Sequence, residues 1–175
     1  MPRSSHGPGT PPSTPVINCS RLLCYAIVDH TVQFSGRTLL FVDGKELGQV
    51  PCLAICENKK LSDVLLFHCD SKWNTLGCSG HQSVAEAKAK AERIYAGISA
   101  LWVDAGISKQ TAEAYLNRQF GSERCSFCGK RPDQVDQMWQ ETRRDRPSDR
   151  QSGQRKQKVR ICDRCVTGFY DTLPK

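Results

Sequence analysis

Apolar positions in the first half of the chain predict a β-sheet. Five short apolar runs with polar borders have the length and composition of strands: residues 21–28, 38–42, 47–55, 63–70 and 73–78. Residues 21–28 could be either a strand or a buried segment without strand structure. Asp43 and Gly44 supply the positive φ of a hairpin turn between the second and third runs, although Pro51 interrupts the third. Residues 70–72 offer a turn between the last two runs. We therefore expect an antiparallel sheet of about four or five strands.

Two stretches after these runs carry apolar residues at helical spacing. Ser83 and Glu86 form a capping-box pattern, and the sequence after them predicts a helix up to Tyr95. Its apolar stripe consists of Val84, Ala87, Ala91 and Ile94. That stripe should cover one side of the sheet. A second helix is expected over residues 108–120, with one face formed by Ala112, Tyr115, Leu116 and Phe120. The front of the chain is thus predicted to be α+β.

The last third of the chain holds two matched cysteine pairs. Each pair has the CxxC spacing, and the four residues are Cys125, Cys128, Cys162 and Cys165. Two such knuckles supply the four thiolates of a closed tetrahedral Zn²⁺ site, which has no open position for a substrate or an activated water. The pattern predicts one structural Zn²⁺. Disulfides, a redox pair and an iron–sulfur cluster are the alternatives.

The other cysteines and histidines do not predict a catalytic site. His68 and Cys69 are neighbours on an expected strand, so their side chains should point to opposite faces. A loop could gather Cys78, His81 and Asp70, but only their nearness in sequence supports that grouping. The pairs at residues 19 and 24 and at residues 52 and 56 could form a second metal site or could be buried thiols in apolar sequence. We expect no enzyme activity and assign no catalytic residue.

The sequence around the CxxC pairs is more specific than their spacing. Residues 125–130 read CSFCGK, residues 133–135 read DQV, and residues 161–166 read ICDRCV. These residues resemble the N-terminal C4 zinc finger of ClpX, the unfoldase subunit of the Clp protease. The resemblance implies a small treble-clef-like domain that dimerises and docks adaptor proteins and some substrates. No GxxxxGK[ST] phosphate loop occurs, so the ATPase motor of that family is not expected here.

These patterns divide the chain into four parts. We expect a disordered tail at 1–16, an α+β domain at 17–106, a connecting helix at 107–121 and a ClpX-type C4 zinc finger at 122–175. The length of 175 residues suits one domain of about 100 residues beside a small metal module. No apolar run approaches the roughly 20 residues of a membrane span, and the Pro-, Ser- and Gly-rich start has no apolar export signal. A cytoplasmic location is therefore expected.

Positive charge is concentrated inside the expected finger. The net charge is +7, and residues 141–160 hold eight basic and three acidic residues. Residues 141–157 lengthen the family's usual connection, and we expect them to form an exposed, flexible insert. Such an insert is compatible with a solvated linker, with nucleic-acid binding by counterion release, or with an acidic protein partner. It lacks the interleaved aromatic residues of a single-strand binder.

The sequence after the second knuckle predicts an interaction surface. One helical stripe is formed by Val166, Phe169, Tyr170 and Leu173. A module this small cannot cover such a stripe alone, so a second copy, a protein partner or the front domain should meet it. We therefore predict a non-enzymatic interaction or dimerisation protein, which could be an accessory or adaptor-binding factor of the Clp protease. The alternative is a nucleic-acid-binding zinc ribbon that uses the basic insert.

Overall fold

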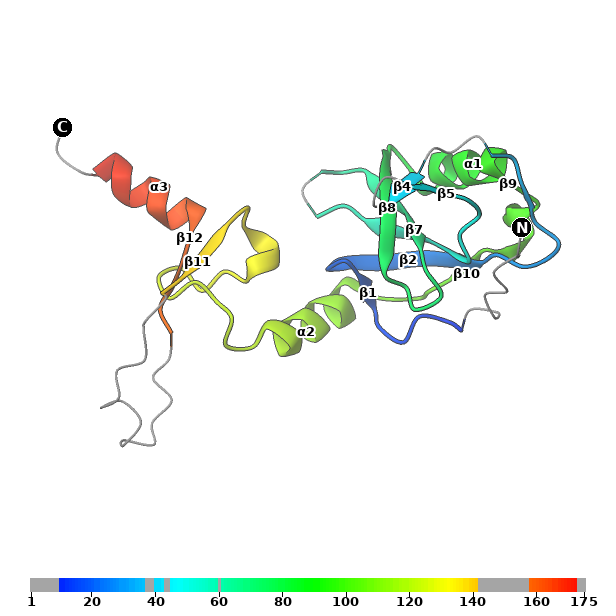
Figure 1. The fold of residues 1–175 in the computed structure, drawn as a ribbon. Helices are drawn as coiled ribbons and strands as arrows, with labels where there is room; N and C mark the ends of the chain where they lie inside the picture. The colour runs from blue at the N-terminus through cyan, green and yellow to red at the C-terminus, as the bar shows by residue number, and fades with distance from the viewer. Residues whose placement is uncertain (1–9, 37–39, 43–44, 60, 142–157, 173–175) are drawn as a thin grey trace, which may run out of the picture. The chain divides into compact units, whose positions relative to one another are not determined.

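The chain folds into two compact units, as the computed structural model in Figure 1 shows. The first unit is Met1–Glu113 and the second is Ala114–Lys175. The described residues are 10–36, 40–42, 45–59, 61–141 and 158–172. The boundary between the units falls inside helix α2 (Lys109–Phe120), within the expected connecting helix. The predicted α+β class is confirmed.

An antiparallel sheet forms the centre of the first unit. Its main strands are β1 (Val16–Ile17), β2 (Ser20–Ile27), β6 (Cys52–Glu57), β7 (Val64–Cys69), β8 (Thr75–His81) and β10 (Val103–Asp104). The order across the sheet is β1-β2-β6-β7-β8, and β10 also pairs with β2. Two short ladders lie apart from it. One joins β3 (Gln33–Phe34) to β9 (Tyr95–Ala96), and the other joins β4 (Leu40–Val42) to β5 (Lys45–Leu47).

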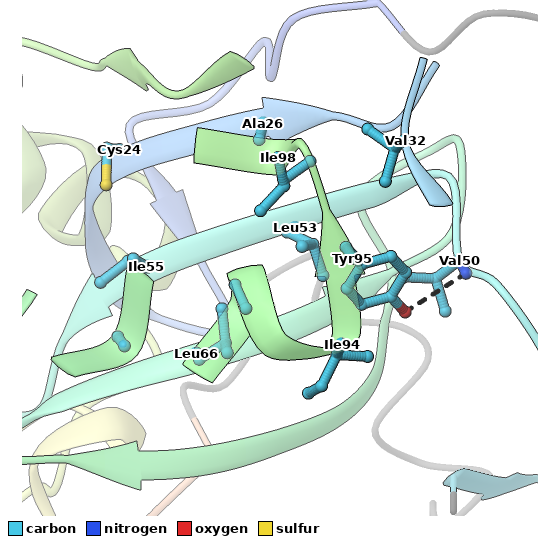
Figure 2. Packing of buried hydrophobic residues seen from close by; sticks show 12 residues of the cluster. Cys24, Ala26, Val32, Val50, Leu53, Ile55, Leu66, Ile94, Tyr95 and Ile98 are labelled. Atoms are coloured by element: carbon cyan, nitrogen blue, oxygen red, sulfur yellow. Dashed lines mark hydrogen bonds between the residues drawn. The ribbon is translucent and has the colours of Figure 1, made fainter. Parts of the chain in front are cut away.

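Helix α1 (Val84–Ile94) packs on one face of this sheet. Ser83 caps it by accepting a hydrogen bond from the Glu86 backbone N–H at 3.2 Å, as the capping pattern predicts. Ala87, Ala91 and Ile94 are buried against residues of β6 and β7, and Figure 2 shows the sheet residues Leu53, Ile55 and Leu66 among them. The predicted apolar stripe therefore covers the sheet.

Tyr95 closes the same core where α1 ends. Its ring is buried, and its hydroxyl accepts a hydrogen bond from the Val50 backbone N–H at 3.5 Å, the dashed line in Figure 2. His68 Nδ1 lies 3.4 Å from the same hydroxyl. The short 3-10 helix η1 (Ile98–Leu101) follows, and Ile98 completes the cluster. The polar atoms of Tyr95 and His68 thus satisfy one another inside an apolar core.

Ordered structure begins earlier than the expected boundary at residue 17. Val16 and Ile17 are buried in β1, and Thr10 accepts a hydrogen bond on its carbonyl oxygen from Trp73 Nε1 at 2.8 Å. The expected tail boundary is therefore wrong for Val16, which packs as a buried strand residue, while residues 10–15 form no helix or strand. Residues 1–9 lie outside the described part of the chain.

The expected hairpin over residues 38–55 is also wrong in its second strand. The partner of β4 is β5, which ends at Leu47, and the Asp43–Gly44 turn lies outside the described residues. The apolar run after Pro51 forms a separate strand, β6, between β2 and β7. The physical reason is burial, since β6 is apolar on both faces and a central position buries both of them. The predicted pairing of the next two runs is confirmed as the β7–β8 ladder.

Candidate metal centre

The first knuckle of the second unit is a tight turn that brings two sulfur atoms together. The backbone N–H of Gly129 donates to the Cys125 carbonyl at 2.9 Å, and the Cys125 N–H donates to the Lys130 carbonyl at the same distance. Gly129 has φ of +70°, in the left-handed region that glycine adopts without steric cost. The glycine that directly follows the CxxC motif therefore closes the knuckle.

The second knuckle joins a strand to a helix. β11 (Met138–Gln140) and β12 (Arg160–Cys162) form an antiparallel hairpin, and α3 (Asp163–Thr172) begins directly after it. Cys162 is the last residue of β12, and Cys165 lies in the first turn of α3. Asp163 fastens this junction, because its backbone N–H donates to the Gln137 carbonyl at 3.1 Å and its carboxylate accepts from the Gln137 N–H at 3.3 Å.

Two hydrogen bonds between Ser126 and Arg160 hold the knuckles beside each other. The Ser126 N–H donates to the Arg160 carbonyl at 2.8 Å, and the Arg160 N–H donates to Ser126 Oγ at 3.0 Å. The Arg160 guanidinium also donates to the Ser122 carbonyl at 3.0 Å. These bonds join β12 to the first knuckle. They bring the two CxxC motifs side by side, although Ser126 and Arg160 are 34 residues apart in the sequence.

The structure brings all four predicted ligands together. The Sγ atoms of Cys125, Cys128, Cys162 and Cys165 all lie within 4.8 Å of one another. Cys125 Sγ is 3.8 Å from Cys165 Sγ, and Cys128 Sγ is 3.6 Å from Cys162 Sγ. Metal–sulfur bonds of about 2.3 Å in tetrahedral geometry require sulfur separations of about 3.8 Å. The four thiols are therefore spaced to hold one metal ion, and no other group of three or more His, Cys, Asp or Glu side chains among the described residues is so placed.

The local electrostatics demand a cation once all four thiols ionise. Burial opposes ionisation of Cys125, but backbone N–H groups of Cys128, Phe127 and Cys162 outweigh it and lower the pKa of that thiol to about 6. Burial, followed by the three neighbouring thiols, raises the pKa of Cys165 to about 12. The low pKa of Cys125 favours a thiolate, and the high pKa of Cys165 reflects burial first and then the crowding of the neighbouring sulfurs. A divalent cation at their centre removes the repulsion between the thiolates.

A buried arginine, Arg131, helps to connect the first knuckle to helix α2. Arg131 is 3% exposed, and its guanidinium makes a two-bond pair with Asp133, with Nε–Oδ1 at 2.9 Å and Nη2–Oδ2 at 3.2 Å. The guanidinium also donates a hydrogen bond from Nη1 to Asn117 Oδ1 at 2.6 Å. Arg124 donates to the same oxygen at 2.7 Å and to the Gly129 carbonyl at 3.0 Å. Asn117 of α2 is therefore tied to the turn that carries the metal ligands.

The predicted interaction stripe lies on α3 and is exposed. Val166 is 42% exposed, Phe169 50% and Tyr170 73%, while Leu173 lies outside the described residues. The sequence analysis did not assign Phe127 to this surface. Its ring is 57% exposed and meets Phe169 at 5.4 Å between ring centroids. We call Phe127, Val166, Phe169 and Tyr170 the aromatic surface. The sequence does contain a signal for Phe127 as a surface residue, because it is an aromatic residue between the two cysteines of a CxxC motif.

The first unit does not assemble the nucleophile–base pairs that the sequence left open. His68 faces the α1 side of the sheet, whereas Cys69 belongs to a cluster on the other face. The Asp70 carboxylate accepts hydrogen bonds from Lys72 and Asn74 of its own turn. His81 Nε2 lies 2.8 Å from Ser79 Oγ, two residues away on the same strand. In the described contacts Asp70 thus stabilises its own turn, while His68 and His81 contact Tyr95 and Ser79.

Three cysteines are buried together on the second face of the sheet. Cys52, Cys56 and Cys69 are fully buried and pack with Ala54 and Phe67. Burial raises the pKa of Cys52 to about 11 and that of Cys69 to about 12, and it also raises the pKa of Cys56. Thiols of this kind stay protonated near neutral pH and behave as small apolar side chains. The interpretation of Cys52 and Cys56 as buried thiols fits their environment.

Comparison of the chain with protein-family models, with curated proteins and with solved structures found no match. In the part of the chain that the structure describes, none of the helices combines the length and the apolar character needed to span a membrane. The basic insert falls almost entirely within residues 142–157, outside the described part of the chain.

Proposed function

We propose that this chain is a cytoplasmic, zinc-binding protein-interaction factor whose second unit is built on a structural Zn²⁺. The placement of four sulfur atoms at tetrahedral separations carries the metal part of the proposal. An all-cysteine donor set suits Zn²⁺, and four protein ligands leave no coordination position for a substrate. The ion then holds two knuckles together, and the chain needs no catalytic residue at this site.

We further propose that the metal module is a treble clef of the ClpX type. The order of its parts supports this, because a knuckle is followed by the β11–β12 hairpin and by a helix whose first turn carries the last ligand. The family resemblance implies that such a finger docks proteins. On that basis an accessory or adaptor-binding role in the Clp protease system is the most specific function that we propose.

The docking site in this proposal is the aromatic surface. Phe127, Phe169 and Tyr170 expose half or more of their area beside a folded metal site. Aromatic residues of this kind are common at protein interfaces and uncommon as solvated groups on a small domain. The occupant is a second copy of the chain or a protein partner, and Val166 extends the apolar area toward the start of α3.

Replacement of Phe169 by aspartate tests this proposal. Burial of a phenylalanine side chain contributes roughly 1.5–3 kcal/mol, and a two-fold axis counts it twice, so Phe169→Asp should raise the dissociation constant of a homodimer by about two orders of magnitude. Sedimentation at several concentrations would measure that change, with zinc content as the test of folding. Leu61→Asp is the matched control, because Leu61 of the first unit is 66% exposed.

A protein partner is tested with the isolated zinc finger of the Clp unfoldase and with its adaptors. Binding that is lost in Phe169→Asp and retained in Leu61→Asp would support the aromatic surface. Binding to nucleic acid that weakens steeply between low and moderate salt, with no effect of Phe169→Asp, would favour the zinc-ribbon alternative. A wild-type chain that neither associates with itself nor binds these partners would refute the docking role while leaving the metal site intact.

A further inference from the structure

The outer strand of the first unit's sheet has one open side in the described part of the chain. β8 pairs with β7, and among the described residues no further backbone hydrogen bond reaches Thr75–His81. β4 comes near β8, but its ladder partner is β5. At the other end of the sheet the edge strands are short, since β1 and β10 have only two residues each. With seven residues, β8 is the longest edge among the strands that the structure describes.

β8 lacks two of the features that usually protect such an edge, which are charged residues and proline. Its sequence is TLGCSGH, without Lys, Arg, Asp, Glu or Pro. Charged residues and proline on an edge strand hinder pairing with another chain, and so do bulges. The ladder of β8 has one bulge, at Leu76, and pairing with β7 is regular from Gly77 to His81. Cys78 and Gly80 are exposed on this regular part. The edge is therefore open to another extended backbone.

We propose that two copies of the chain pair through β8, antiparallel about a two-fold axis at Cys78, so that their sheets become continuous. Cys78 is the central residue of the strand, and this register pairs Gly77, Cys78 and Ser79 of each copy, which lie on the regular side of the bulge at Leu76. Gly77 then faces Ser79 of the second copy, and the bulged Leu76 comes next to Gly80 of the second copy. The large side chain meets the residue without one, so the two strands fit without a steric conflict.

The charge of β8 favours a second copy as the occupant. In a two-fold arrangement each charged residue would face either itself or a residue of the same strand, and like charges directly opposite one another destabilise a strand pair. β8 carries no fully charged side chain, so self-pairing meets no such repulsion. A neutral strand also offers nothing that would select an acidic or a basic peptide. This pairing is independent of the metal module and of the proposed docking role.

The first test measures association in a chain that carries Phe169→Asp, so that contacts through α3 do not contribute. Sedimentation of this chain should show a dimer that dissociates on dilution. Adding Cys78→Lys places two ammonium groups opposite each other and should raise the dissociation constant about fivefold or more. Adding Cys78→Ser instead removes the thiol without adding charge and should leave the constant unchanged. Circular dichroism of each variant checks that the exposed position tolerates the change.

The second test traps the pair as a disulfide. Facing residues of antiparallel strands have Cα atoms about 4.5–5.5 Å apart, which lies within the range that a disulfide spans. Oxidised glutathione should therefore convert two Cys78 thiols into one intermolecular disulfide, while it is itself reduced to two glutathione thiols. Mass spectrometry of the zinc-saturated, Phe169→Asp chain would map the bond. Cys19→Ser, at another accessible cysteine, should cross-link normally, and Cys78→Ser should not.

Two results would overturn the proposal. One is a Phe169→Asp chain that stays monomeric at every concentration that sedimentation reaches, which would mean that the β4–β5 hairpin or solvent alone covers the edge. The other is a dimer that forms as readily with Cys78→Lys and yields no bond between the two Cys78 residues. Neither result would affect the metal site or the role of the aromatic surface, so the two proposals fail separately.

Discussion

Phe127 and Phe169 meet edge to face, with ring planes at 80° and centroids 5.4 Å apart. One ring belongs to the first knuckle and the other to α3, so this contact joins the two halves of the metal site on its solvent side. Aromatic pairs of this geometry contribute about 0.5–1.5 kcal/mol beyond the area that they bury. The aromatic surface is therefore a composite of both knuckles, and its shape depends on their relative placement.

We expect one tightly bound Zn²⁺ per chain. Metal analysis of the purified protein should give a stoichiometry near one, and X-ray absorption should give four sulfur neighbours at about 2.3 Å. Cys162→Ser should abolish tight binding because it removes a buried ligand. Cys78→Ser is the control, since that exposed thiol lies in the first unit. A zinc content near zero, or one that Cys162→Ser leaves unchanged, would contradict the assignment.

Removal of the metal should unfold the second unit and spare the first. The second unit has a small buried cluster of Cys125, Val135 and Cys162, with Met138 and Cys165 at its border, and two of its three buried members are ligands. The free energy of binding such a metal is therefore folding free energy. After chelation, amide hydrogen exchange should become fast throughout β11, β12 and α3 while β6 and β7 stay protected. Equal loss of protection in both units would show that they fold as one.

Two glycines of the second unit should respond in opposite directions to alanine. Gly129 has φ of +70°, which costs an L-residue about 1–2 kcal/mol, and a Cβ there would meet nothing within 4 Å, so the cost of Gly129→Ala is conformational. Gly168 lies inside α3 with equally open surroundings. Gly168→Ala should stabilise the helix by about 0.5–1 kcal/mol.

The affinity of each glycine variant for Zn²⁺, measured by competition with a chelating dye, reports this difference because metal binding and folding are coupled. Gly129→Ala should weaken binding by about one order of magnitude, and Gly168→Ala should strengthen it severalfold. Gly129→Asn should be milder than Gly129→Ala, because asparagine enters the left-handed region more easily. Equal effects of the two alanine substitutions would contradict the assigned turn.

His68 should make the first unit less stable in mild acid. Burial, followed by repulsion from His81 and Lys90, lowers the pKa of His68 to about 4. The unfolded chain has a histidine pKa near 6.5, so between pH 6.5 and 4 only the unfolded form takes up this proton. The contribution of neutral His68 is complete above pH 6.5 and is lost as the pH falls toward 4. It amounts to about 3 kcal/mol.

Urea unfolding at pH 7 and pH 5, followed by tryptophan fluorescence, would measure this loss. A Trp139→Phe background restricts the signal to Trp73 and Trp102 of the first unit. His68→Gln should flatten the pH dependence, while His30→Gln, at an exposed position, should keep it. A pH dependence that persists in His68→Gln would assign it to other groups.

The local sequence pattern was sufficient to predict features that depend on a single helix. The spacing of Ala87, Ala91 and Ile94 predicted which face of α1 is buried, and Ser83 predicted where the helix begins. Strand pairing was harder, because it depends on segments that lie far apart. Leu53 belongs to a strand that pairs with residues near Ala26, a relationship that no local turn signal records. The prediction of a hairpin over residues 38–55 was wrong for this reason.

The CxxC spacing predicted the metal ligands, but the sequence did not predict the residues that support them. A CxxC motif specifies its own geometry, and the four cysteines were found from sequence alone. Nothing in the local sequence distinguishes Arg131 from the other arginines. Its burial follows from partners at Asp133 and at Asn117, and the second of these lies 14 residues away. Likewise, the contact between Phe127 and Phe169 arises only after the metal site has brought the knuckles together.

The position of Cys165 in the first turn of α3 makes the ion the nucleus of that helix. The sequence DRCVTGFYDT is rich in weak helix formers and has only ten residues, fewer than the about 12–15 that an isolated helix needs in water. Coordination by Cys162 and Cys165 fixes the first turn, which is the costly step. Without the ion, Phe169 and Tyr170 would be spread along a coil. Any partner that requires the helix must therefore tighten zinc binding by the same factor by which zinc tightens partner binding.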